Sequence, residues 1–442
     1  MERIFSKRLD DWKVSSNRKP LIVRGARQVG KTYIIKQFGS KSFSGKVHVV
    51  DFEKHPEWHD IFKKNLDPIR IINELEIVLN AKITPGQDLL FFDEIQAAPQ
   101  AISALRYFYE ELPGQHVIAA GSLLDFAMKE ISFPVGRINI RDMAPLNFYE
   151  FLKSSGKDKA ADIICSAPER LSDAIHTMLL ESLRQYMFIG GMPECIKVWK
   201  KSQSMADVFE IQSDLVESYR QDFSKYAPYT DKRSLNYALH AVAKNIGHQI
   251  KYTQLSDEFT GPTNKKAFDL LMLARVIGKV RAASPASLPL GAMASEKKFK
   301  AVLLDIGLMR KLNDLPANLE YTKNDLLSMY NGAMAEQFAG QEFISSGMNN
   351  LYYWSRDAKS SSAEIDYLIT RNNKVYPVEI KGGASGRLRS MHMILRQNSH
   401  IEQAYVLSTA PFGKILEQKL TFLPLYYAYG LSMTDSTSGS CF

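Results

Sequence analysis

The sequence predicts an α/β fold divided into several domains. Short apolar runs alternate with polar helical stretches in residues 1–146, residues 147–230 are helical, and strand-like runs return from about residue 279 onward. Apolar strands that alternate with helices are typical of a parallel sheet covered by helices on both faces. With 442 residues the chain is long enough for several separate cores.

The first domain is expected to cover residues 1–146. Its apolar runs read as buried parallel strands: "PLIVRG", "KVHVVDF", "DLLFFDE" and "QHVIAAGS". The segment "GARQVGKT" follows the first of these runs and precedes a helical stretch, which is the context that a phosphate-binding loop requires. Its residues are therefore the candidate nucleotide contacts: Gly25, Ala26, Arg27, Gln28, Val29, Gly30, Lys31 and Thr32.

Each residue type in this loop suits polyphosphate chemistry. The glycines let backbone amides close around a phosphate at the start of a helix. Lys31 is expected to reach the outer phosphates, and Thr32 to ligate magnesium. The loop therefore predicts binding of ATP with Mg²⁺.

Acidic and basic residues at other strand ends complete the predicted nucleotide site. Asp93 ends a wholly apolar strand and is expected to hold magnesium, while Glu94 is expected to polarise the attacking water. Ser122 is a candidate sensor of the terminal phosphate or an ordinary helix cap. Arg137, ahead of Arg141, is the first candidate for neutralising charge in the transition state, within the chain or across a subunit contact.

The remaining chain is expected to hold three further parts and a tail. Residues 147–230 read as a helical lid or connector. Residues 231–315 show three short helices followed by two strands, the order of a winged helix. Residues 316–431 combine a helix with a small mixed sheet, and residues 432–442 form a polar, flexible tail.

With these motifs assembled, the chain resembles a family of bacterial and archaeal AAA-type P-loop ATPases. The resemblance spans about Arg3 to Tyr429 and rests further on the segments "APLNFYEFL", "YMFIGGMPECI", "YRQDFSKYA", "VLLDIGL", "NGAMAEQFAGQE" and "YYWSRD". That family joins an AAA core to a C-terminal domain of unknown function, part winged helix and part restriction-endonuclease-like. The resemblance implies magnesium-dependent ATP hydrolysis, a DNA-related role and a homo-oligomer. Leu123 follows Ser122, so a second polar sensor is missing there.

The segment "EIDYLITRNNKVYPVEIKGG" predicts a β-hairpin that turns at Asn372 and Asn373, because asparagine tolerates the left-handed backbone of two-residue turns. This register places Asp366 opposite Glu379, and Glu364 opposite Lys381. Pro377 cannot donate to a ladder, so we expect its strand to be bulged or to lie at a sheet edge.

Two interpretations of this hairpin are open. Asp366 and Glu379 can share Mg²⁺ or Mn²⁺ beside Lys381, which resembles the PD-(D/E)xK nuclease pattern, with Glu336 of the preceding helix as a further metal ligand. Alternatively, Glu364 and Lys381 form a cross-strand ion pair while Asp366 and Glu379 face water.

Composition limits the partners and the compartment. The formal net charge of +8 suits a nucleic-acid partner, and Lys265, Lys266, Lys297, Lys298 and Lys300 are candidate phosphate contacts in the predicted winged helix. Three widely spaced cysteines and the lack of a signal peptide or a long apolar run predict a cytoplasmic protein without integral membrane association.

The leading hypothesis is therefore an ATP hydrolase that couples its nucleotide state to a DNA-binding region, with metal-dependent DNA cleavage at the hairpin as an additional activity. The alternative is a nucleotide-switched binding or signalling protein with an inactive nuclease fold.

Overall fold

The computed structural model describes residues 3–125, 136–226, 230–286, 288–314, 331–358, 361–383 and 387–433. It divides into two compact units. One consists of Glu2–Ala144 with Leu273–Arg275, and the other of Pro145–Met272 with Val276–Phe442. No helix in these described ranges has both the length and the apolar character that crossing a membrane requires.

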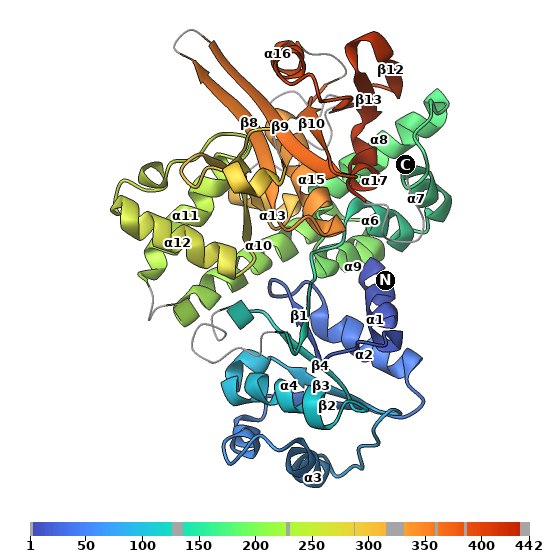
Figure 1. Ribbon diagram of the computed structural model, residues 1–442, viewed down its shortest axis with the longest axis vertical. Coiled ribbons are helices and arrows are strands. Elements are labelled where there is room, and N and C mark those ends of the chain that lie inside the picture. Colours follow the sequence, from blue (N-terminus) through green and yellow to red (C-terminus); the bar gives the residue numbers. More distant parts are fainter. Residues whose placement is uncertain are drawn as a thin grey trace. The chain divides into compact units, whose positions relative to one another are not determined.

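The first unit contains a five-stranded parallel sheet with strand order β2-β3-β4-β1-β5 (Figure 1). Its strands are β1 (Leu21–Arg24), β2 (Val47–Asp51), β3 (Leu89–Asp93), β4 (His116–Gly121) and β5 (Asn139–Asp142). Its helices are α1 (Ile4–Val14), α2 (Lys31–Ser42), η1 (Pro56–Phe62), α3 (Pro68–Leu79), η2 (Ile95–Ala97) and α4 (Pro99–Glu111). The four predicted strands and the parallel sheet are confirmed, whereas β5 is short and half-exposed and gave no apolar signal.

The core of this sheet forms because β3 and β4 are apolar along their whole length. Every residue of both strands is buried. Phe92 of β3 packs with Leu105 and Phe108 of α4 and with Leu75 of α3 in one apolar cluster. Because these strands are apolar, both faces of the sheet must be covered by helices. The polar residues therefore lie at the carboxyl ends of the strands, which we call the carboxyl edge of the sheet.

The second unit begins with helices, as the sequence predicts. They are α6 (Phe148–Ser154), α7 (Asp158–Ile164), α8 (Asp173–Ile189), α9 (Pro193–Ser202), α10 (Met205–Asp222) and η3 (Phe223–Tyr226). Asn147 caps α6 in a capping box with Glu150, and Ser204 caps α10 through the amide of Asp207.

The predicted winged-helix segment shares its sheet with the C-terminal strands. It contains α11 (Lys232–Lys244), η4 (Tyr252–Gln254), α12 (Gly261–Leu273), β6 (Ile277–Ala282), η5 (Leu290–Met293), β7 (Phe299–Leu303) and α13 (Ile306–Leu312). The middle helix of the three expected is only the short 3₁₀ turn η4. Strand β6 pairs with β7 on one side and, in parallel, with β8 on the other, so the ribbon is part of a larger sheet.

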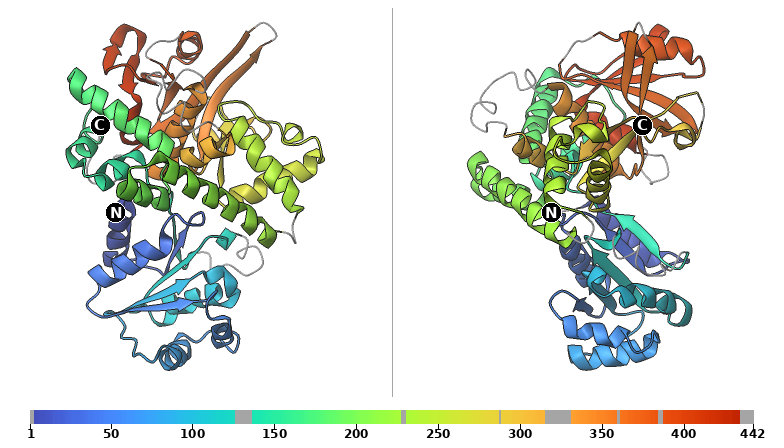
Figure 2. Two further views of the ribbon diagram at one scale, coloured as in Figure 1. Left: turned by 180° about the vertical axis from the view of Figure 1, so that it is seen from behind. Right: turned by 90° about the vertical axis from the view of Figure 1, so that its left-hand side faces the viewer.

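That sheet has eight strands in the order β12-β13-β11-β10-β9-β8-β6-β7. The later elements are α15 (Asn331–Ser346), β8 (Leu351–Ala358), β9 (Ser361–Arg371), β10 (Lys374–Ile380), α16 (Arg389–Gln397), β11 (Ala404–Ser408), β12 (Gly413–Ile415), η6 (Leu416–Gln418), β13 (Leu420–Pro424), η7 (Leu425–Tyr427) and α17 (Ala428–Ser432). Helix α15 packs against β7, β8 and β10, while α16 packs against β9 (Figure 2).

The hairpin of β9 and β10 has the predicted turn and register. Asn372 and Asn373 both have positive φ, at 47° and 56°, and Val378 pairs with Tyr367. The expectation for Pro377 was wrong, because β10 lies between β9 and β11 in the interior of the sheet. In the antiparallel ladder with β9, Pro377 and Leu368 form a pair that is not hydrogen-bonded, between two pairs that are. The nitrogen of Pro377 therefore points toward β11, and β11 pairs with β10 only from Val378 onward.

Candidate functional site

The phosphate-loop sequence forms a tight loop between β1 and α2. Gly30 precedes α2 with φ of 96°, which glycine adopts without strain. A Cβ on Gly25 would lie 2.3 Å from the carbonyl oxygen of Met143, so only glycine fits there. Both glycines of the predicted loop are therefore required by the backbone, Gly30 by its positive φ and Gly25 by its close approach to Met143.

Lys31 points back into this loop. Its ammonium donates to the carbonyl oxygens of Gly25 at 3.0 Å and Ala26 at 2.9 Å. Burial lowers the pKa of Lys31 to about 8, although the charges of Glu94 and Asp93 act in the opposite direction. The buried cation is held where the loop would surround a phosphate.

Thr32 and Asp93 meet at the carboxyl edge of the sheet. The Thr32 hydroxyl donates to Asp93 Oδ1 at 3.1 Å. Burial raises the pKa of Asp93 to about 6. Two adjacent hard oxygen ligands in this position fit Mg²⁺, so the residues present agree with the metal that the phosphate loop implies.

Glu94 follows Asp93 with a left-handed backbone, at φ of 49°. Its Oε2 accepts a hydrogen bond from Gln96 Nε2 at 2.6 Å. Gln96 was not among the predicted site residues, because its only signal in the sequence is a polar side chain two residues after Glu94. This contact fixes the direction of the Glu94 carboxylate.

The other two predicted nucleotide contacts lie at opposite edges of the sheet. Ser122 directly follows β4, whose carboxyl end lies beside that of β1. Arg137 precedes β5, which runs parallel to β1, so it lies at the amino edge, where its guanidinium pairs with Glu110 at 2.7 Å and its side chain is 46% exposed. Within the chain, the structure brings Ser122 to the phosphate-loop edge and does not bring Arg137 there.

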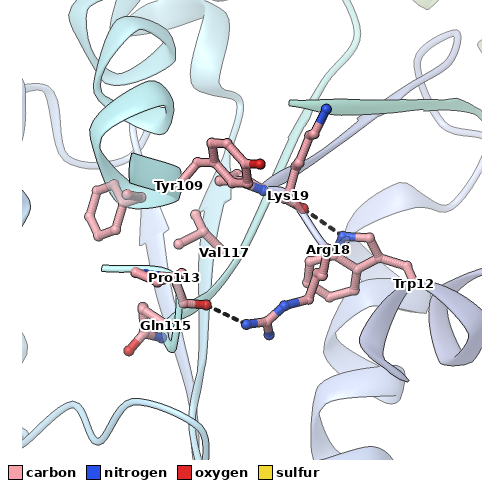
Figure 3. Close-up of a pocket in the computed structure, with 9 residues that line it drawn as sticks. Trp12, Arg18, Lys19, Tyr109, Pro113, Gln115 and Val117 are labelled. Carbon is pink, nitrogen blue, oxygen red and sulfur yellow. Dashed lines mark hydrogen bonds between the residues drawn. The ribbon is translucent and has the colours of Figure 1, made fainter. Parts of the chain in front are cut away.

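A small cavity lies near the amino ends of β1 and β4 (Figure 3). Its volume is about 10 Å³, enough for one water. Arg18 donates to the carbonyl oxygen of Pro113 at 2.5 Å, and Trp12 Nε1 donates to that of Lys19 at 2.7 Å. This cavity is too small for a nucleotide and lies at the wrong edge of the sheet.

Two of the predicted metal ligands, Glu336 and Asp366, lie together with Glu364 around a buried lysine in the second unit. Lys300 Nζ lies 2.9 Å from Glu336 Oε1, 2.5 Å from Glu364 Oε1 and 3.5 Å from Asp366 Oδ1. Although burial by itself lowers the pKa of Lys300, the charges of these carboxylates raise it above its ordinary value.

Glu379 and Lys381 form a second pair beside this cluster, 2.5 Å apart. Burial, followed by the charge of Asp366, raises the pKa of Glu379, and the same two causes raise that of Glu336. In the ranges that the structure describes, no three acidic, histidine or cysteine side chains are arranged to hold a metal ion.

These contacts differ from two expectations. The ion pair predicted between Glu364 and Lys381 is replaced by separate pairs, Glu364 with Lys300 and Lys381 with Glu379. Lys300 is 1% exposed and is not a surface contact for DNA phosphates. Its signal in the sequence was a lysine inside the apolar run "FKAVLL", where burial demands acidic partners.

Comparisons with known proteins match three separate parts of the chain. Residues 17–152 match the family model of an AAA domain. Residues 180–319 match a domain of unknown function, DUF8612, and residues 331–427 match another, DUF4143. An uncharacterized protein of Methanocaldococcus jannaschii is 29% identical over 174 residues, which cover 39% of this chain and 35% of that protein, about a third of its length.

Solved structures give weaker similarities. A Walker-type ATPase of Pyrococcus abyssi has a TM-score of 0.44 at 14% identity, covering 71% of this chain and 95% of that one. RuvB of Thermotoga maritima has a TM-score of 0.30 at 17% identity, covering 62% and 87%. Orc1 of Aeropyrum pernix, solved in complex with DNA, has a TM-score of 0.26 at 11% identity, covering 71% and 91%.

The phosphate loop, its parallel sheet and the family models lead to one assignment: the chain carries an AAA-type P-loop domain at residues 17–152 and a DUF4143 domain at residues 331–427.

Proposed function

We propose that this protein binds ATP with Mg²⁺ at the phosphate loop and hydrolyses it. The observation that carries the proposal is the contact of Thr32 with Asp93, which joins the end of the loop to the acidic strand tip at 3.1 Å. Hydrolysis by this class of loop depends on positioning and charge stabilisation, and these residues supply both.

Each residue has a separate task in this proposal. Lys31 would contact the outer phosphates once it leaves the Gly25 and Ala26 carbonyl oxygens. Thr32 and Asp93 would hold Mg²⁺, which would supply neutralisation of the phosphate charge. Glu94, held by Gln96, accepts a hydrogen bond from the attacking water and polarises it. Ser122 at the end of β4 contacts the terminal phosphate.

ATP turnover and nucleotide binding in purified variants test this proposal. Glu94→Gln is expected to lose at least about a hundredfold of turnover while still binding ATP, because a positioned base contributes on this scale. Lys31→Ala is expected to lose both. Lys36→Ala, an exposed lysine on the same helix, is the matched control and should behave as wild type. Unchanged turnover in Glu94→Gln would contradict the assignment.

A DNA-facing role for the second unit is a second candidate. It is favoured by exposed cations on α12, Lys265 and Lys266, and at the start of α16, where Arg387 precedes the helix and Arg389 is its first residue. Because Glu336, Glu364 and Asp366 are already bonded to an ammonium, we favour DNA contact with an inactive nuclease fold over cleavage.

DNA binding and DNA-stimulated ATP turnover, each measured at low and physiological salt, test this candidate. Lys265→Ala with Lys266→Ala should weaken DNA binding and reduce its salt dependence, whereas Lys244→Ala on α11 should not. DNA binding that does not respond to salt, or metal-dependent nicking by the wild type, would count against it.

A further inference from the structure

Lys300 is the second residue of the fully buried strand β7. Phe299 and Ala301 flank it in β7, and the side chain of Lys300 is 1% exposed. A buried ammonium needs a partner for each of its three N–H groups. Three carboxylates lie within 3.5 Å of its nitrogen, which also lies over the ring of Tyr353, 5.3 Å from the ring centroid.

The three carboxylates come from two elements that would otherwise repel one another. Glu336 projects from α15, while Glu364 and Asp366 belong to β9. The second oxygen of Asp366 is also engaged, because it accepts the amide of Ile380 at 2.7 Å. The side chains of Glu336 and Asp366 are 10% and 17% exposed, while that of Glu364 is 38% exposed. Like charges packed this closely are costly unless a cation lies among them, above all for the two more buried groups.

A β-bulge in β9 turns the Asp366 carboxylate toward the Lys300 ammonium. Tyr352 pairs with Leu368 and Trp354 pairs with Ile365, so two residues of β9, Asp366 and Tyr367, lie opposite the single residue between Tyr352 and Trp354. Bulges re-aim side chains in this manner. The Tyr367 hydroxyl donates to the carbonyl oxygen of Glu336 at 2.8 Å, which fastens the same segment to α15.

We propose that Lys300 is the resident cation of this cluster and does the charge balancing that a divalent ion would do between α15 and β9. Removing its ammonium leaves three oxygen ligands facing one small space. Carboxylates are the ligands that Mn²⁺ and Mg²⁺ prefer, so the deletion creates a divalent-cation site where the wild type has none. This inference does not rest on the proposed ATPase.

The test uses the full chain carrying Asp93→Asn, so that metal at the phosphate loop does not contribute. Mn²⁺ binding is followed by electron paramagnetic resonance and stability by the melting midpoint. Lys300→Ala is expected to lower the midpoint by roughly 6–12 °C, bind one Mn²⁺ and regain most of the loss when Mn²⁺ is added. The matched control is Lys279→Ala in the neighbouring β6, whose 12% exposed side chain pairs with the 69% exposed Glu296 and should gain no Mn²⁺ binding.

Two further measurements test the proposal even if Lys300→Ala does not fold, because they use the parent and a double variant. The Asp93→Asn parent is expected to bind no Mn²⁺, and Lys300→Ala combined with Asp366→Asn is expected to be more stable than Lys300→Ala and to bind no Mn²⁺. A parent that binds one Mn²⁺, lost on Asp366→Asn, would overturn the proposal. So would Lys300→Ala that matches its parent in stability, or that folds and binds no Mn²⁺.

Discussion

Lys31 shows how one side chain couples nucleotide binding to pH. Its pKa is lowered by burial to about 8, whereas contact with a polyphosphate favours the charged form and raises the pKa in the complex. Binding above about pH 8 therefore requires uptake of a proton. The affinity for Mg-ATP is expected to be level around neutral pH and to weaken several-fold between about pH 8 and pH 9.

Titration of a fluorescent nucleotide across this pH range measures the effect. Lys31→Arg is the control, since a guanidinium stays charged throughout and should give a flat profile even if the affinity is lower. A wild-type profile as flat as that of Lys31→Arg would show that Lys31 is fully charged in the empty loop.

At the scale of elements, the β9–β10 hairpin depends on a turn with a left-handed backbone, which asparagine and glycine adopt more easily than other residues. Asn373 has φ of 56°, so Asn373→Val is expected to lower the free energy of unfolding by about 1–2 kcal/mol. Asn373→Gly should be neutral or stabilising, because glycine adopts this backbone freely. Urea unfolding of the two variants makes the comparison, and equal loss in both would contradict it.

Helix α13 depends on a buried carboxylate that also holds a distant loop. Asp305 Oδ1 accepts the amide of Leu308 at 3.1 Å, and Oδ2 accepts that of Gly191 at 2.5 Å. Asp305→Ala is expected to cost about 2–4 kcal/mol, because it removes a helix cap and leaves a buried amide unpaired.

Thermal unfolding and hydrogen exchange of residues 187–196 and 303–312 measure this loss. Asp158→Ala, on the exposed first turn of α7, should change stability by only a few tenths of a kcal/mol. Faster exchange confined to residues 303–312 would mean that Asp305 only caps α13.

At the scale of the whole molecule, the C-terminal strands of the eight-stranded sheet need β6 and Lys300, which come much earlier in the chain, in order to fold. A fragment of residues 331–433 lacks β6, which pairs with β8, and lacks Lys300 among its acids. We expect it to be unfolded or aggregated, because it exposes a long strand edge and an unbalanced buried charge. A fragment of residues 145–433 keeps both and should fold.

Near-ultraviolet circular dichroism and size-exclusion chromatography distinguish the two fragments. A monomeric 331–433 fragment with a cooperative melting transition would show that β6 and Lys300 are dispensable for the C-terminal strands.

The sequence alone was sufficient wherever the determining interactions are local. The phosphate loop from Gly25 to Thr32, the apolar strands β3 and β4, and the turn at Asn372 and Asn373 each depend on residues a few positions apart. The hairpin register followed from the turn for the same reason, since the turn type sets which residues face each other.

Only the tertiary structure decided which distant residues share a site. Nothing local to "FKAVLL" indicates that Lys300 meets Glu336 from α15 and Asp366 from β9, or that β6 pairs with β8. The same holds for Arg137, whose place at the amino ends of the strands follows from the parallel pairing of β5 with β1. Such contacts are fixed by packing and by the need of buried charges for partners, which act between segments that are far apart in the chain.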